Sequence, residues 1–201
     1  MVAVCAAMPP RILAIALLLV GPALGQRAPE RPEPAPRMDV AVTYSVTTGD
    51  EPPTEMRIAY HAASATFRIE PPAASGAAIV ILARRGRDEA VMVMESRQAW
   101  LPLDAGGNML RDLELSLASG RVTRLGTLRV ADIACTNWRL PEPALGTACV
   151  SQRGVLLRRE PLQGGRMVAT FVDQREQDVA RFRPPANFRA ITMEEMVAAP
   201  R

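Results

Sequence analysis

Strict alternation of apolar and polar residues is the feature that most constrains how this chain can fold. In residues 39–47 the larger apolar side chains recur at every second position, at Val40, Val42, Tyr44 and Val46. Successive side chains of a β-strand point to opposite faces, so a period of two predicts a half-buried strand. The pattern recurs in residues 54–61 and 65–70, with turn-forming residues between the segments. The chain is therefore predicted to begin its domain with a β-meander.

Two later segments, residues 77–83 and 90–94, are apolar at every position. They are predicted to be strands covered on both faces, and the polar turn between them indicates a hairpin at the centre of a sheet. Further strand-like segments bring the expected total to roughly nine or ten strands. These segments are residues 98–103, 121–132, 133–140, 148–158 and 166–174.

Helices are expected at two places. Residues 109–118 fit a helix capped by Asn108, but the alternation of Leu113, Leu115 and Leu117 fits a strand equally well, so both interpretations stay open. Thr192 and Glu195 match a capping box, which predicts a short exposed helix at the end of the chain.

The N-terminal residues have the organisation of a secretory signal. Arg11 precedes the apolar run 12–20, and Ala23 and Gly25 have the small side chains of a cleavage site, so cleavage is expected after Gly25. The run is much shorter than the ~20 residues that cross a bilayer, so no transmembrane anchor is expected. Translation is expected to begin at Met8. The mature protein is predicted to be periplasmic.

The mature chain is expected to form one monomeric domain. Residues 26–38 contain four prolines and no large apolar side chain before Met38, which predicts a disordered, extended leader. The domain is expected to span residues 39–192, followed by a tail at 193–201. All 24 basic residues are arginine, and the net charge is only +3. That charge is too small to indicate nucleic-acid binding.

Cys135 and Cys149 are the cysteines of the expected mature form. They can face each other across a hairpin at a distance that a disulfide tolerates, and we predict that they are bonded. Two free thiols or half of a metal site are the alternatives. A zinc site needs four ligands, and the chain has one histidine, so no metal site is expected.

Catalytic chemistry has little support in the sequence. Any imidazole base would have to be His61, whose position at the end of a strand favours a solvated or locally hydrogen-bonded ring. No Gly-x-Ser-x-Gly elbow, acid/base carboxylate pair or phosphate-binding loop is present. The protein is therefore not expected to be an enzyme or to bind a cofactor, and a hydrolase is the third choice of function.

Three segments resemble a known family. Residues 126–138 with their Cys-x-x-Trp, residues 148–158 with Cys149 and Gly154-Val155, and the ending 182–188 are similar to an uncharacterised family of exported bacterial domains in the LolA-like superfamily. The resemblance covers about residues 39–190. It implies a mainly β fold, a curved antiparallel sheet that forms a half-open barrel with one or two covering helices. Lipoprotein carriers of that superfamily hold acyl chains on the concave face.

The expected function is a binding module that holds a lipid, an acyl chain or a lipoprotein on an apolar sheet face. Methionine suits such a site because its side chain adapts to varied ligands, although it also fills ordinary cores. The alternative is an envelope interaction or sensor domain with a protein partner and no small ligand. The candidate lining residues are Ile79, Ile81, Met92, Met94, Trp100 and Phe171.

Overall fold

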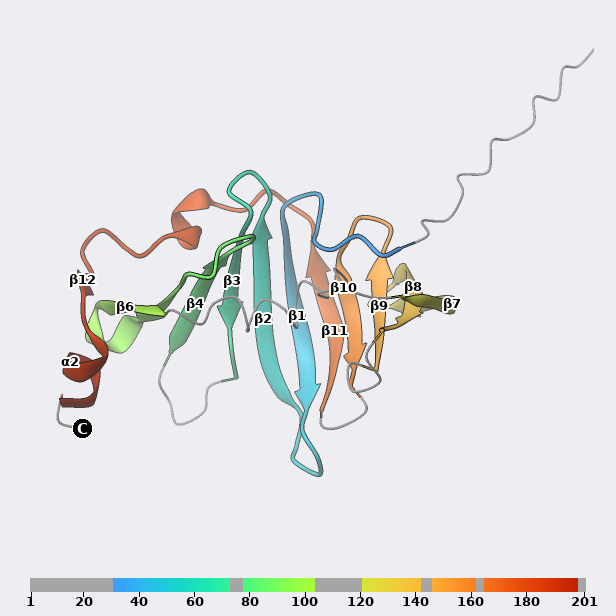
Figure 1. The fold of residues 1–201 in the computed structure, drawn as a ribbon, viewed down its shortest axis with the longest axis horizontal. Helices are drawn as coiled ribbons and strands as arrows, with labels where there is room; N and C mark the ends of the chain where they lie inside the picture. Colours follow the sequence, from blue (N-terminus) through green and yellow to red (C-terminus); the bar gives the residue numbers. More distant parts are fainter. Residues whose placement is uncertain (1–30, 73–77, 104–120, 142–145, 162–164, 199–201) are drawn as a thin grey trace, which may run out of the picture.

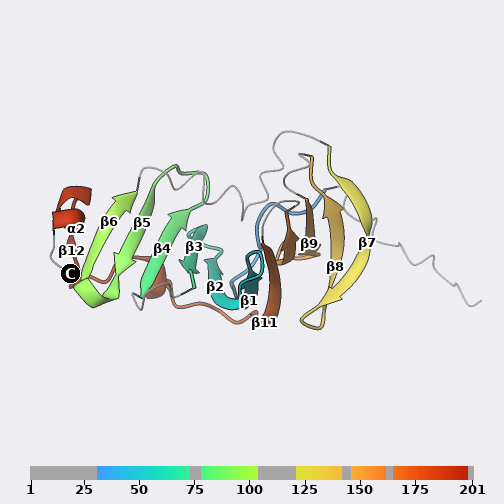
Figure 2. The same cartoon turned by 90° about the horizontal axis from the view of Figure 1, so that it is seen from below.

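A computed structural model describes residues 31–72, 78–103, 121–141, 146–161 and 165–198. These residues form a mainly β protein built on one open, curved, twelve-stranded sheet (Figures 1 and 2), which confirms the predicted fold class. The expected signal segment and the ambiguous residues 109–118 lie outside the described residues. No helix in the described part of the chain is long and apolar enough to span a membrane.

The strands form two consecutive meanders. The first consists of β1 (Val40–Thr47), β2 (Thr54–His61), β3 (Thr66–Glu70), β4 (Ile79–Arg84), β5 (Ala90–Met94) and β6 (Ala99–Leu103). The second consists of β7 (Thr123–Val130), β8 (Ile133–Arg139), β9 (Thr147–Ser151), β10 (Leu156–Glu160) and β11 (Arg166–Asp173).

Antiparallel pairing of β1 with β11 joins the two meanders at the centre of the sheet. The strand order is β12-β6-β5-β4-β3-β2-β1-β11-β10-β9-β8-β7. The two-residue strand β12 (Arg189–Ala190) pairs in parallel with β6 and occupies that edge. Neither β12 nor this parallel pair was expected from the sequence.

The two faces of the first meander are covered differently. We call the face that carries Val42 and Tyr44 the inner face and the opposite face, which carries Trp100, the outer face. The C-terminal arm after β11 runs along the outer face (Figure 2), where Phe188 packs against a cluster formed by Val80, Leu82 and Val93. This cover explains why β4 and β5 are apolar on both faces.

One helix, α2 (Met193–Ala198), closes the described chain. The capping box is present as predicted: the backbone N–H of Thr192 donates to the Glu195 carboxylate at 2.8 Å, and the Glu195 N–H donates to the Thr192 hydroxyl at 3.2 Å. Met196 packs against the cluster formed by Met94, Ala99, Leu101 and Ile191, so this helix is not merely an exposed tail.

The expected single strand at 148–158 is two strands, β9 and β10. The turn between them places Gly154 at φ +82, a conformation that glycine adopts readily. This turn also accounts for part of the difference between the expected and observed strand numbers.

Candidate binding site on the inner face

A continuous apolar row crosses the inner face of the first meander. Each residue of the row is the register partner of the next on the neighbouring strand. Five steps between strands, at about 4.8 Å each, make the row about 24 Å long. Its members are Val42, Ile58, Ile69, Ile81, Met92 and Leu101.

Four of the six residues predicted to line a ligand lie together on this face. Ile79 pairs with Met94, and Ile81 pairs with Met92, at alternate positions of β4 and β5. Ile79, Ile81 and Met92 are half-buried, whereas Met94 is buried. These four side chains form the candidate site, with α2 packed beside them at the β6 edge.

Trp100 and Phe171 lie on the outer face. Trp100 pairs with Val93 and packs with the outer-face cluster. Phe171 pairs with Thr43, whose side chain points away from the inner face, and it is 62% exposed. The structure therefore does not bring these two residues together with the other four.

The other half of the inner face is closed by the chain's own N-terminal residues. A cavity of about 30 Å³ remains between Pro34–Pro36 and the side chains of β1–β3. This volume has room for about two waters, not for an acyl chain. The residues that line it from the sheet and the β9–β10 turn are Val40, Val42, Tyr44, Ile58, Tyr60, Phe67, Gly154, Val155 and Leu156.

The predicted leader is thus packed against the domain along its described part. Ala35 is only 6% exposed and belongs to the main apolar cluster. Arg37 donates its backbone N–H to the carbonyl of Arg153 at 3.0 Å. A disordered spacer was expected because prolines cannot form a regular packed element, but an extended segment can still bury a small side chain.

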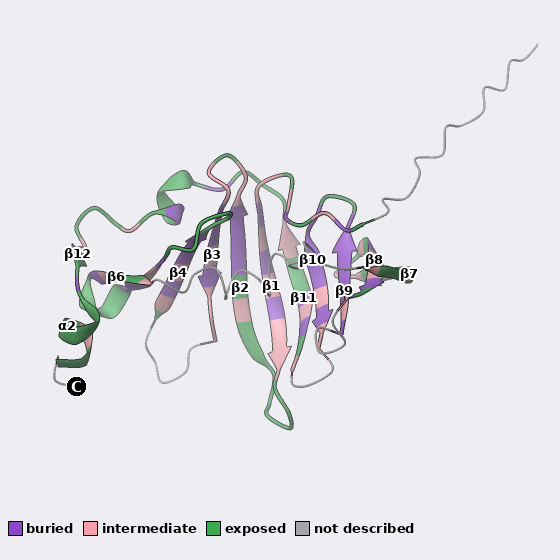
Figure 3. Ribbon diagram, viewed as in Figure 1, coloured by how far each residue is buried: buried purple, intermediate pink, exposed green. Residues whose placement is uncertain are grey.

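Three buried aromatic residues of β1–β3, Tyr44, Tyr60 and Phe67, line this half of the face. The buried stretches of these strands are coloured purple in Figure 3. The Tyr44 hydroxyl donates to the carbonyl of Leu156 at 2.7 Å. Burial raises the pKa of Tyr44 far above its ordinary value, so its hydroxyl stays protonated as a donor. The rings of Tyr60 and Phe67 lie 4.6 Å apart beside it.

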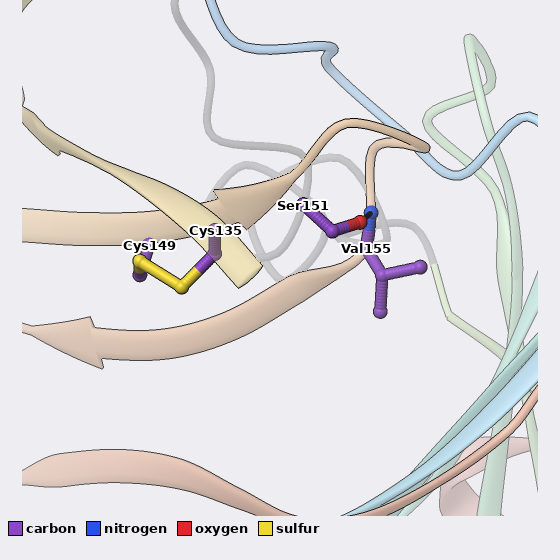
Figure 4. Close-up of a disulfide and its surroundings, with 4 residues drawn as sticks. All are labelled: Cys135, Cys149, Ser151 and Val155. Atoms are coloured by element: carbon purple, nitrogen blue, oxygen red, sulfur yellow. Dashed lines mark hydrogen bonds between the residues drawn. A yellow bond between two sulfur atoms is a disulfide. The ribbon is translucent and has the colours of Figure 1, made fainter. Parts of the chain in front are cut away.

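The predicted disulfide is confirmed. Cys135 and Cys149 are bonded (Figure 4), with their Cα atoms 5.5 Å apart. Both are almost fully buried. They are diagonal neighbours, not opposed residues, because Cys135 pairs with Ser151 in the register. The Ser151 hydroxyl accepts the N–H of Val155 at 3.1 Å, which fixes the turn after the bonded strand.

Asp39 joins three separate parts of the chain. Its two carboxylate oxygens accept the backbone N–H of Ala62, at 2.7 Å, and of Gln177, at 2.9 Å. Burial acts to raise the pKa of Asp39, but these donors, together with nearby His61, outweigh burial and lower it. The start of β1 is thereby tied to the β2–β3 turn and to the C-terminal arm.

His61 is locally hydrogen-bonded, one of the two states expected for it. Its Nδ1 lies 2.8 Å from the Ser64 hydroxyl and accepts the Ser64 N–H at 3.3 Å, while the ring packs 5.4 Å from that of Phe182. Within the described ranges, no group of three or more histidine, cysteine or carboxylate residues is placed to hold a metal ion.

Comparison with known proteins supports the fold. No family model and no curated protein matches the chain. The crystal structure of an uncharacterized conserved protein from Thermus thermophilus is similar, with a TM-score of 0.54 and 10% identity over 78% of this chain and 91% of that one. This likeness shows the fold alone.

Weaker similarity extends to MucB in complex with MucA(peri), with a TM-score of 0.43 and 16% identity. It covers 80% of this chain and 59% of MucB. The Pseudomonas aeruginosa MucA/MucB complex gives a TM-score of 0.40 and 16% identity, over 77% of this chain and 58% of that one.

Proposed function

We propose that this chain is an exported binding module of the LolA-like superfamily that holds a lipid or an acyl chain on the inner face of β4–β6. The observation that carries the proposal is the apolar row across six strands, which ends in half-buried Ile81 and Met92 and in Leu101. Flexible methionine side chains can adapt to acyl chains of different lengths. Export fits the signal-like N-terminus and the disulfide, which persists in oxidising compartments.

The ligand itself provides the test. The chain is produced with its signal segment, purified from the periplasm and extracted with organic solvent for mass spectrometry. We expect a lipid at close to one molecule per protein. A folded protein that carries none, and that does not bind a fluorescent fatty acid, contradicts the proposal.

Two variants locate the ligand. Met92→Glu places a charge in the apolar row and should abolish lipid binding, because burying a carboxylate against an acyl chain is strongly unfavourable. Phe171→Glu makes the same chemical change on the outer face, where the side chain is already 62% exposed, and should leave binding intact. Equal loss of binding in both variants would exclude the inner face as the site.

A protein-interaction or sensor domain is the second candidate function. The aromatic half of the inner face favours it, because that half already holds an extended segment of polypeptide, residues 34–36. An enzyme is not part of either proposal. Replacing His61 by alanine tests for one, since an activity that depends on an imidazole base would be lost.

A further inference from the structure

Residues 32–36 occupy a pocket that is shaped around an extended peptide. Pro32 and Ala35 are buried, and Pro34, Ala35 and Pro36 line the cavity beside Tyr44, Tyr60 and Phe67. We call this the Ala35 pocket, and define it by those three aromatic residues together with Gly154, Val155 and Leu156. Aromatic side chains are the usual surface on which proline-containing extended segments bind.

Gly154 adapts the pocket to a peptide backbone. A Cβ atom at this position would lie 2.2 Å from the carbonyl oxygen of Ala35, far inside any permitted contact. The φ of Gly154 is +82, which also disfavours any other residue. The pocket therefore accepts a main-chain carbonyl against Gly154 and a small side chain at the position of Ala35.

The segment in the pocket is held in a way that allows exchange. Pro32, Pro34 and Pro36 have no backbone N–H, so they cannot donate hydrogen bonds to the body of the protein. The backbone bond from Arg37 to the carbonyl of Arg153 lies at the end of the segment, outside the pocket. Glu33 forms a salt bridge with Arg37, the residue that directly follows the segment. Apolar contact thus provides most of the attraction inside the pocket.

We propose that the Ala35 pocket is a binding site for an extended, proline-containing peptide of a partner protein, and that residues 32–36 are its internal occupant. The proposal rests on the second candidate function and gives that function a site. It does not require a lipid at β4–β6, which lies on the other half of the face. An attached segment has an effective concentration in the millimolar range, so a partner peptide must compete with it.

A labelled peptide tests the proposal. A fluorescent peptide of residues 31–38 is titrated onto the chain that begins at residue 26, both unchanged and as Ala35→Asp, and anisotropy is measured. The buried charge should release the internal segment from the Ala35→Asp protein. We expect saturable binding to that variant and binding weaker by at least about tenfold to the unchanged protein, whose pocket is filled.

Two controls distinguish binding in the pocket from nonspecific binding of the peptide. A peptide that itself carries Ala35→Asp should not bind, and adding Phe171→Asp on the outer face should leave binding unchanged. If the Ala35→Asp protein shows no cooperative thermal unfolding transition, the double variant Pro34→Gly/Pro36→Gly is used instead, because it loosens the segment and keeps Ala35. Either of two results overturns the proposal. One is a folded variant protein that does not bind the unchanged peptide at about 1 mM, and the other is equal binding of the unchanged peptide and the Ala35→Asp peptide.

Lipid and peptide results can be told apart. Met92→Glu should remove lipid binding and leave peptide binding to the Ala35→Asp protein intact. A protein that binds the peptide but no lipid would therefore contradict only the function proposed for β4–β6. Loss of peptide binding alone bears on the Ala35 pocket.

Discussion

The hydroxyl of Tyr44 donates a hydrogen bond to the carbonyl oxygen of Leu156 across a sequence separation of 112 residues. Because β11 lies between β1 and β10 in the sheet, this bond connects strands that are not direct neighbours. Both residues line the Ala35 pocket, so the bond lies beside it.

Replacing Tyr44 by phenylalanine should lower the free energy of unfolding by about 1–3 kcal/mol, because the buried carbonyl of Leu156 loses its partner. Urea denaturation measures the change. Thr47→Val removes a 3.4 Å bond from an exposed hydroxyl to Arg166 and should change stability by less than about 0.5 kcal/mol. Equal losses of stability in the two variants would show that the buried Tyr44 bond contributes no more than the exposed Thr47 bond.

Removing the disulfide should destabilise the protein substantially. Cys135 and Cys149 are separated by 14 positions, and closing a loop of that size stabilises a fold by about 3 kcal/mol. The Cys135→Ala/Cys149→Ala variant should lose about that amount, measured by urea denaturation. Reductant should cause a similar loss in the unchanged protein and none in the variant. A reductant effect on the variant would show that another group is responsible.

Asp39 should make stability depend on pH. Its pKa is lowered in the folded protein, so its contribution is complete above the unfolded value, about 3.9, and is lost as the pH falls through the folded value. Asp39→Asn should lower the free energy of unfolding by about 1 kcal/mol at pH 7, and the difference should shrink below about pH 4. Asp88→Asn makes the same change at an exposed position and is measured alongside as the control. A difference that persists at pH 2–3 contradicts the assignment.

Two glycines with similar backbone angles should respond differently to alanine. Gly86 has φ +73 and open space around it, so Gly86→Ala should cost about 1–2 kcal/mol for the left-handed conformation alone. Gly146 has φ +64, but a Cβ there would lie 1.9 Å from the carbonyl oxygen of Glu160. The collision should add about 1–3 kcal/mol. Thermal unfolding of the two variants measures the difference in stability. Equal losses would contradict the close approach of Gly146 to the carbonyl of Glu160.

Local pattern was sufficient to predict most strands. Residues 54–61 and 90–94 form β2 and β5 with the expected bounds, since period two and apolar runs are properties of the segment itself. Pairing of β1 with β11 was not predicted because it depends on contacts between distant parts of the chain. Strand β12 was missed because two residues carry no periodic pattern.

Only four of the six candidate lining residues share the inner face, because the face on which a residue lies also depends on contacts outside its own segment. In a segment that is apolar on both faces, such as β4 or β5, alternation cannot show which face is inner. Phe171 lies on the outer face because of an irregularity in the pairing: Tyr44 pairs with Ala169, but Thr43 pairs with Phe171, so Thr170 is an extra residue. This bulge reverses the expected face of every later residue in β11. The Ala35 pocket was missed because proline composition does not reveal what an extended segment contacts.

The central place of β1 in the sheet has a consequence for synthesis. Its second neighbour, β11, ends at Asp173, so the edge of β1 that faces β11 stays unpaired in a nascent chain until residue 173 has been synthesised. An unpaired strand edge of this kind can form hydrogen bonds with a strand of another chain. Association between incomplete chains should therefore compete with native folding until β11 is available to cover this edge.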